Sequence, residues 1–275
     1  MLGAAGQLGS ELARLTGGNS GLTHQQASVT DPQSIDDLLN SRRPELVFNC
    51  AAYNAVDRAE TERDLAYAIN SEGPANVAMS CARHGIRLVH FSTNFVFDGA
   101  LERPYVETDL PSPLSVYGAS KLEGEQRVLE LLPEALVIRT SAVYGDRGSA
   151  IKGGSFPERI VARARLGQPL RVVADQKVNP TYTGDLAPAA IELAEGRLEG
   201  LVHVVAAGCA GWDEFARVAL VESGVSSDVE SIFSAELAAP AARPLNGCLE
   251  STRVAALRPW QDGLHEWARR QASQA

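Results

Sequence analysis

Short, almost continuously apolar runs alternate with helical segments along the first half of the chain, and this alternation restricts the fold more than any other feature. The apolar runs are residues 45–51, 86–92 and 135–139. Such runs are typical of strands in a parallel sheet, because helices cover both faces of that kind of sheet. The repeated strand–helix order therefore predicts an α/β fold with a doubly wound, Rossmann-like parallel sheet.

The helical segments are recognised from apolar spacing and from signals at their ends. Leu8, Leu12 and Leu15 recur at helical spacing and would form one apolar face. Asp31 followed by Pro32 is a helix start, with a capping side chain before a proline at the first helical position. The predicted helices of the first half are residues 7–15, a segment that starts at Asp31, residues 64–83 with an interruption near Gly73 and Pro74, and residues 117–132.

In the second half of the chain, predicted strands and helices alternate less regularly. The elements predicted there are a glycine-rich loop over residues 145–155, a helix over 157–166, a strand over 202–205 and a helix over 212–223. Trp212, Trp260 and Trp267 fall on predicted helices, where aromatic side chains usually pack in the core. A chain of 275 residues is long enough for one large α/β domain with a smaller lobe.

The charge balance of the chain restricts its partners. The formal net charge is −9 at pH 7 and the pI is near 5.1. An acidic chain is poorly suited to nucleic acid or an anionic membrane as its main partner. A phosphate ligand remains compatible with this charge, because backbone amides bind phosphate without charged side chains.

The chain also lacks patterns that would place it outside the cytoplasm. No apolar run is long enough to span a bilayer, and the first residues do not form a signal peptide. The four cysteines form neither a CxxC pair nor a zinc spacing, so we expect reduced thiols in a cytoplasmic protein. The five histidines form no HxxH pattern, and no metal site is predicted.

Gly3, Gly6 and Gly9 form a GxxGxxG loop just before the first predicted helix. Glycines at this spacing let the backbone turn tightly and approach a pyrophosphate, which then lies on the helix N-terminus. Alone, the motif is a weak signal. Only Met1 and Leu2 precede it, so we expect a truncated first strand and a natural protein that begins roughly five residues earlier.

Tyr117 and Lys121 are four residues apart on a predicted helix and therefore share one face. A phenol titrates near 10, and a cation held beside it lowers that pKa and helps it to pass on its proton. As an isolated pair, these two residues are usually an ordinary surface contact. Thr93 strengthens the functional reading, because it ends a strand at the sheet edge where ligands bind and its hydroxyl could contact the same carbonyl oxygen.

The chain contains a series of uncommon short sequence motifs in a fixed order. They are Gly3 to Gly9, Asn49 to Glu60, Ser92 to Gly99, Pro104-Tyr105 with Glu107 and Asp109, Tyr117 to Lys121 with Gly124-Glu125, Arg139 to Gly145, Pro180-Thr181, Asp185 to Ala187, and Arg243 to Asn246. Through these strings the chain resembles the extended short-chain dehydrogenase/reductases, and within them the dTDP-4-dehydrorhamnose reductase family. The resemblance covers nearly the whole chain.

The resemblance implies an NAD(P)-binding domain over residues 1–145 and a substrate-binding lobe over 146–275 that is interleaved with the end of the sheet. It implies reduction of the 4-keto group of a nucleotide-linked deoxysugar, with Tyr117 as proton donor, Lys121 as its partner and Thr93 as the third catalytic residue. The implied cofactor-binding residues are Gly3, Gly6, Gln7, Leu8 and Gly9 at the pyrophosphate, Ala51, Ala52 and Tyr53 along the cofactor, Tyr117 and Lys121, and Ser28 and Val29 at the adenine end.

The chain departs from the family pattern beside the implied sugar. Asn94 stands where the family usually has Asp, and Ala142 stands where it usually has Trp. Loss of a large ring should enlarge or reshape the pocket, so Thr93, Asn94 and Ala142 are the candidate substrate residues. Residues 21–26 hold no carboxylate to bind a ribose 2′-hydroxyl, which favours NADPH and leaves NADH open.

Two other functions stay open on the same fold. One is a sugar-nucleotide epimerase or dehydratase, which would keep NAD bound through turnover. The other is a non-catalytic, NADP-binding regulatory subunit. Some family members are described as dimers with a magnesium ion between subunits, which leaves a homodimer open. Glu11 matches one such position, although a first-turn carboxylate also suits a helix dipole.

Overall fold

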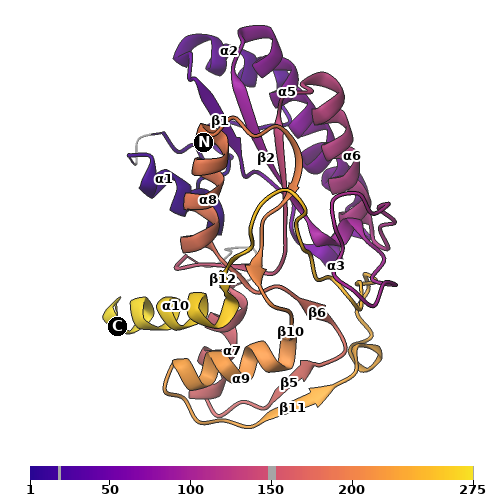
Figure 1. The fold of residues 1–275 in the computed structure, drawn as a ribbon, viewed down its shortest axis with the longest axis vertical. Coiled ribbons are helices and arrows are strands. Elements are labelled where there is room, and N and C mark those ends of the chain that lie inside the picture. The colour runs from indigo at the N-terminus through magenta and orange to yellow at the C-terminus, as the bar shows by residue number, and fades with distance from the viewer. Residues whose placement is uncertain (18–19, 148–152, 275) are drawn as a thin grey trace.

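A four-stranded parallel sheet forms the centre of the computed structural model, which describes residues 1–17, 20–147 and 153–274 (Figure 1). Its strands are β1 (Leu46–Asn49), β2 (Arg87–Thr93), β3 (Leu136–Thr140) and β8 (Gly200–His203), in the order β1-β2-β3-β8. All three pairings are parallel. The predicted α/β fold with a parallel central sheet is confirmed.

Leu2 extends this sheet beyond β1. It forms isolated parallel bridges to both Leu22 and Asn49, so it lies between them. The chain therefore places Leu22 on one side of Leu2 and then crosses to β1 on the other side. A parallel sheet has its topological switch point at such a reversal, and ligands bind at the carboxyl ends of the strands there.

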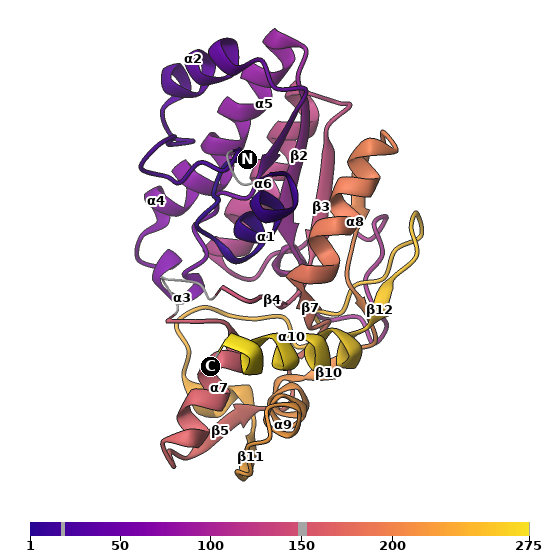
Figure 2. The same cartoon turned by 90° about the vertical axis from the view of Figure 1, so that its left-hand side faces the viewer.

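Helices cover both faces of the sheet (Figure 2). On one face, α2 (Pro32–Arg42), α5 (Gly73–His84) and α6 (Val116–Leu131) pack their apolar side chains on the strands. On the other face, α1 (Gln7–Leu15) and α8 (Thr183–Glu195) do the same. Two faces covered in this way explain why the strand sequences are almost continuously apolar.

The helix predicted over residues 64–83 is interrupted, as expected, but one turn earlier than Gly73. It consists of α4 (Arg63–Tyr67), a π-helical turn over Ala68–Glu72, and α5. The cause is Asn70 within that turn. Its side chain accepts from the Tyr53 amide at 2.8 Å and donates to the Tyr53 carbonyl at 3.0 Å, which holds the loop after β1.

A buried ion pair joins α6 to β3. The Arg139 Nε and Nη2 atoms bind both carboxylate oxygens of Glu125 at 2.6–3.1 Å. Both side chains are almost completely buried. Gly124 permits the close approach of α6 to the π-helical turn, because a Cβ there would lie 2.0 Å from the Asn70 carbonyl oxygen.

The second half of the chain builds a smaller lobe below the sheet in Figure 1. Its helices are α7 (Phe156–Arg165), α9 (Trp212–Glu222) and α10 (Trp260–Gln274), beside the parallel pair β5 (Leu170–Val173) and β11 (Val229–Ile232). Trp260 and Trp267 are buried in its core and Trp212 packs against it, which confirms that all three are packing residues.

Short strand pairs connect this lobe to the edge of the sheet. They are β4 (Val143–Tyr144) with β7 (Thr181–Tyr182), β6 (Lys177–Val178) with β10 (Ala210–Gly211), and β9 (Ala206–Ala207) with β12 (Leu257–Pro259). The remaining described elements are α3 (Val56–Ala59) and the 3-10 turns η2 (Asn94–Val96) and η4 (Ser234–Leu237). Of the glycine-rich loop predicted over residues 145–155, residues 148–152 lie outside the described chain.

The expectation of four reduced cysteines is wrong. Cys209 and Cys248 form a disulfide, with their Cα atoms 6.0 Å apart, whereas Cys50 and Cys81 are free thiols. The two bonded residues are 39 positions apart, and the fold brings them together because Asn179 binds the backbone on both sides, at Gly208 and Leu249. In the described part of the chain, no helix has the length and apolar character needed to cross a membrane.

We predict that Gly124→Ala destabilises the protein by about 1–3 kcal/mol, because the new methyl group would overlap the Asn70 carbonyl and force α6 away from its partner. Denaturant unfolding monitored by circular dichroism measures the change. Gly196→Ala is the matched control, since its right-handed backbone (φ −68°) accepts a side chain. That control should stay within about 0.5 kcal/mol of the wild type, and equal effects of the two substitutions would refute the explanation.

Candidate active site

The glycine-rich loop lies at the switch point of the sheet. Gly3 has a φ of 77°, and a Cβ there would lie 2.7 Å from the Ala51 nitrogen. A Cβ on Gly9 would lie 2.3 Å from the Gly3 carbonyl oxygen. These glycines therefore let α1 dock directly on the segment that follows β1. The fold brings the loop beside Ala51, whereas no contact among the described residues places Ala52 against it.

The N-terminus of α1 is suited to an anion. Gly6 is its N-cap residue, and no described side chain caps the first turn, which begins with Gln7 and Leu8. The first N–H groups of a helix lack partners within the helix and lie at the positive end of its dipole. A pyrophosphate at the loop would therefore meet backbone donors here.

Other residues predicted for the cofactor serve mainly to hold the fold. Tyr53 is buried, and its hydroxyl donates to the Glu62 carboxylate. Val29 is buried in the core beneath α2 and α5, while the Ser28 hydroxyl pairs with Thr30 at 2.8 Å. Each of these side chains has a contact within the protein.

Thr93, Tyr117 and the first turn of α6 meet at the carboxyl end of β2. Ser115 caps α6 by accepting from the Gly118 amide at 3.2 Å. The Phe95 and Tyr117 rings pack edge to face, with centroids 5.3 Å apart. Thr93 is the last residue of β2, and its side chain lies near that of Tyr117. The structure thus places two of the three predicted catalytic residues close together.

Lys121 lies one turn further along α6 and is 2 % exposed. Its ammonium donates to the Phe91 carbonyl of β2 at 2.7 Å. Burial lowers the pKa of Lys121 to about 8, and the negative charge of Glu125 opposes this shift. The ammonium is therefore charged at neutral pH and loses its proton just above it.

Tyr117 holds a proton at neutral pH. Withdrawal of the phenol from water raises the pKa of Tyr117 above its ordinary value, and the hydrogen bond with Thr93 lowers it in part. A phenol in this state is a proton donor. A cation such as Lys121, one turn further along the same helix, favours the phenolate that remains after the proton leaves.

The two departures from the family pattern follow two neighbouring strands, β2 and β3. Asn94 is 2 % exposed and donates from Nδ2 to the Gly247 carbonyl at 3.0 Å. Ala142 is half-buried at the turn from β3 into β4 and has a φ of 44°. A non-glycine residue in this left-handed region is strained, and such residues are frequent at functional sites.

Sequence reasoning missed the contacts of the segment 241–249, which we name the strap. It crosses from the smaller lobe to the carboxyl end of β2. The Arg243 guanidinium pairs with Asp57 of α3 at 2.8 Å, and the Gly247 carbonyl lies on Asn94. The family string Arg243 to Asn246 marked the segment as important, but nothing in its composition indicates which residues it contacts.

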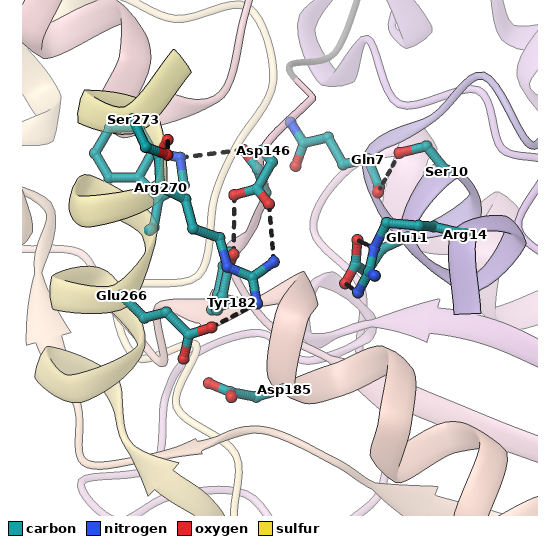
Figure 3. A network of polar contacts seen from close by, with 12 residues as sticks. Gln7, Ser10, Glu11, Arg14, Asp146, Tyr182, Asp185, Glu266, Arg270 and Ser273 are labelled. Carbon is teal, nitrogen blue, oxygen red and sulfur yellow. Dashed lines mark hydrogen bonds and ion pairs between the residues drawn. The ribbon is translucent and has the colours of Figure 1, made fainter. Parts of the chain in front are cut away.

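A network of polar contacts holds α10 against the loop after β4 (Figure 3). Asp146 accepts from the Tyr182 hydroxyl at 2.8 Å and pairs with Arg270 at 3.2 Å. Across from it, Arg14 of α1 forms an ion pair with Glu11 at 2.6 Å. The Glu11 carboxylate is therefore engaged by a cation on its own helix.

Comparison with known proteins identifies relatives over almost the whole chain. Residues 1–273 match the model of the RmlD substrate binding domain. The dTDP-4-dehydrorhamnose reductase of Aggregatibacter actinomycetemcomitans is 35% identical over 270 residues, which cover 92% of this chain and 90% of the relative. The probable dTDP-4,6-dihydroxy-2-methyloxan-3-one 4-ketoreductase of Streptomyces antibioticus is 39% identical over 280 residues, covering 96% and 92%.

A solved structure of a related protein also matches the fold of this chain. The dTDP-4-dehydrorhamnose reductase of Bacillus anthracis, in complex with NADP, superposes with a TM-score of 0.91 at 32% identity, covering 98% of this chain and 97% of that one. The match of the family model over residues 1–273 leaves almost no part of the chain outside it. The chain therefore belongs to the RmlD substrate binding domain family.

Proposed function

We propose that the protein reduces the 4-keto group of a nucleotide-activated deoxysugar with NADPH, as a dTDP-4-dehydrorhamnose reductase does. The proposal rests on the position of Thr93 near Tyr117 at the end of β2, with Lys121 one turn further along α6 and bound to the Phe91 carbonyl. It is supported by relatives at 35% and 39% identity that are described as sugar-nucleotide ketoreductases. A homodimer and a cytoplasmic location stay predictions.

The glycine loop fits a dinucleotide. Gly3 and Gly9 let the loop, α1 and the segment after β1 pack closely, and the N-terminus of α1 carries no described side-chain cap. Residues 21–26 hold no carboxylate that would repel a 2′-phosphate, and the Bacillus anthracis relative was solved with NADP. We therefore favour NADPH over NADH.

Each residue of the pair on α6 has a distinct task in this reaction. When bound, NADPH supplies the hydride for the carbonyl carbon. Tyr117 donates its proton to the carbonyl oxygen, because its phenol is protonated at neutral pH. Lys121 then stabilises the phenolate with its buried ammonium and binds the cofactor ribose, while Thr93 orients the oxygen that receives the proton.

The substrate would be a 4-keto-6-deoxysugar carried on a nucleoside diphosphate. Ala142 presents only a methyl group where the family usually has a Trp, so the space beside the sugar is wider than the family pattern implies. We expect a tolerance for sugars that differ from dTDP-4-dehydrorhamnose in their substituents.

A panel of 4-keto nucleotide sugars tests the proposed function directly. Oxidation of NADPH, followed by the loss of absorbance, should depend on one or more of these sugars. Protein that retains NAD through purification and leaves NADPH unconsumed would instead identify an epimerase or dehydratase. Protein that binds NADP but turns over no sugar would identify a regulatory subunit.

We predict that Tyr117→Phe lowers turnover by about 10²–10⁴-fold, the usual contribution of a positioned proton donor. NADPH binding should be nearly unchanged, since the ring keeps its contact with Phe95. Steady-state kinetics and NADPH fluorescence measure the two effects. Tyr67→Phe on α4 is the matched control and should retain wild-type turnover. Wild-type turnover in Tyr117→Phe would exclude this residue as the donor.

We also predict that the affinity of the free enzyme for NADPH falls as the pH rises through about 8. Below that pH the Lys121 ammonium is charged and binds the ribose, and above it the charge is lost. Fluorescence titration with NADPH at pH 6 to 10 measures the change. Lys121→Met should bind weakly at every pH, and a transition near pH 8 that persists in this variant would assign it to another group.

A further inference from the structure

The first turn of α6, which carries Tyr117, is held at two points of its backbone. Gly118 lies against the turn after β2, because a Cβ there would be 2.2 Å from the Phe95 carbonyl oxygen. The Val116 amide donates to the Glu60 carboxylate at 2.9 Å. Tyr117 stands between these two residues in the chain, so the two contacts fix the backbone from which its phenol extends.

Glu60 reaches α6 from the end of α3. It is the C-cap residue of α3 and is half-buried. The preceding residue, Ala59, is fully buried in a small apolar cluster against which Val116 and Tyr117 pack. The short helix α3 therefore makes both an apolar and a polar contact with the start of α6 (Figure 1).

The start of α6 needs an acceptor from outside the helix. The first N–H groups of a helix have no partners within it and lie at the positive end of its dipole. Ser115 accepts from the Gly118 amide at 3.2 Å, but the first turn of α6 contains no acidic side chain. Glu60 supplies both an acceptor and a negative charge, from a position 56 residues earlier in the chain.

The strap in turn holds α3. Asp57, three residues before Glu60, accepts from the Ala241 amide at 3.3 Å and pairs with the Arg243 guanidinium at 2.8 Å. Because these contacts tie α3 to the strap, Glu60 extends from a fixed backbone. Its carboxylate can therefore determine where the first turn of α6 lies.

We propose that Glu60 is a positioning residue for Tyr117, which sets the place of the phenol by holding the Val116 amide. The inference rests on the proposed function, in which Tyr117 gives its proton to the ketone oxygen. Glu60 takes no part in that transfer. Proton transfer requires the two oxygens to lie within hydrogen-bonding distance, so a displacement of about 1 Å at the phenol costs up to about 100-fold in rate.

Two substitutions at position 60 test whether the acceptor is what matters. Glu60→Ala removes it, and turnover should fall by about 10- to 100-fold. Glu60→Gln keeps an oxygen that accepts from Val116, so its turnover should stay within about threefold of the wild type. In both variants the KM for NADPH should change by less than about threefold, since Lys121 has its own contact with the Phe91 carbonyl.

A double-mutant cycle tests whether Glu60 acts through Tyr117. Glu60→Ala is combined with Tyr117→Phe, and hydride transfer is measured in a single turnover of each protein. If Glu60 only places the phenol, it has no further effect once the hydroxyl is gone. The double variant should then match Tyr117→Phe within about twofold. Losses that multiply would show a general effect on the fold and would overturn the proposal.

Glu236→Ala is the matched control. Glu236 also accepts from a backbone amide at the start of a short helix, that of Phe233 at 2.8 Å, but it lies on η4 in the smaller lobe. Its turnover should equal that of the wild type. Three results would overturn the proposal: equal losses in Glu236→Ala and Glu60→Ala, equal losses in Glu60→Gln and Glu60→Ala, or a higher KM in Glu60→Ala with unchanged turnover.

Hydrogen exchange measures the contact itself and needs no substrate. Peptides that cover the start of α6 should exchange faster in Glu60→Ala than in the wild type or Glu60→Gln, because the Val116 amide loses its acceptor. If the wild type reduces none of the sugars, the proposed function fails, but exchange still decides whether Glu60 holds α6. Equal exchange in Glu60→Ala and the wild type would overturn the inference.

Glu60→Asp keeps the inference testable if Glu60→Ala does not fold, which thermal melts reveal. Its carboxylate retains the charge but is one methylene shorter, so it can reach Val116 only if α6 or α3 shifts. Turnover should fall by about threefold or more, with a nearly unchanged KM for NADPH. Wild-type turnover in Glu60→Asp would overturn the proposal.

Discussion

The buried ion pair between Glu125 and Arg139 fixes α6 on the sheet, and the candidate site depends on where α6 lies. Removal of one partner from a buried pair costs about 3–5 kcal/mol, because the other charge is left without compensation. Tyr117, Lys121 and Glu125 follow one another at intervals of four residues and therefore share one face of the helix. The pair thus holds α6 in place two turns away from the Tyr117 phenol.

This arrangement gives α6 an unusual inner face. Where most helices place apolar side chains on a sheet, α6 places a phenol, an ammonium and a carboxylate toward β2 and β3. Each is matched by a partner on a strand or at its end. The Glu125 carboxylate also lies close enough to Lys121 to oppose the lowering of its pKa by burial. One salt bridge therefore contributes to both the position of the helix and the charge state of the site.

Much of the fold was predictable because its signals are local. Apolar runs gave the strands of the sheet, and Asp31 with Pro32 gave the start of α2, where the Asp31 side chain caps Ser34. The helix interruption was foreseen from Gly73, but its cause, the inward turn of Asn70 toward Tyr53, depends on a loop 17 residues away. The disulfide between Cys209 and Cys248 was missed for the same reason.

The candidate site likewise combines features that local sequence predicts with contacts that it does not. The spacing of Tyr117 and Lys121 is a local property of one helix, and the strand end at Thr93 follows from its apolar run. The contact of Asn94 with Gly247 joins residues 153 positions apart, so no periodicity reveals it. The orientation of an amide is set by the acceptor that it meets, and the strap supplies that acceptor only after the two halves of the chain have packed.

The interleaved course of the chain also limits how such a protein can diversify. The edge strand β8 and the helix α8 come from the second half of the sequence, yet they complete the sheet and cover α1. A cut after residue 145 would leave β3 with an open edge and one face of the sheet covered by α1 without α8. The second half of the chain is therefore not a separate unit that recombination can exchange. Changes in either half have to arise in place, as substitutions in a scaffold that both halves of the gene must continue to build.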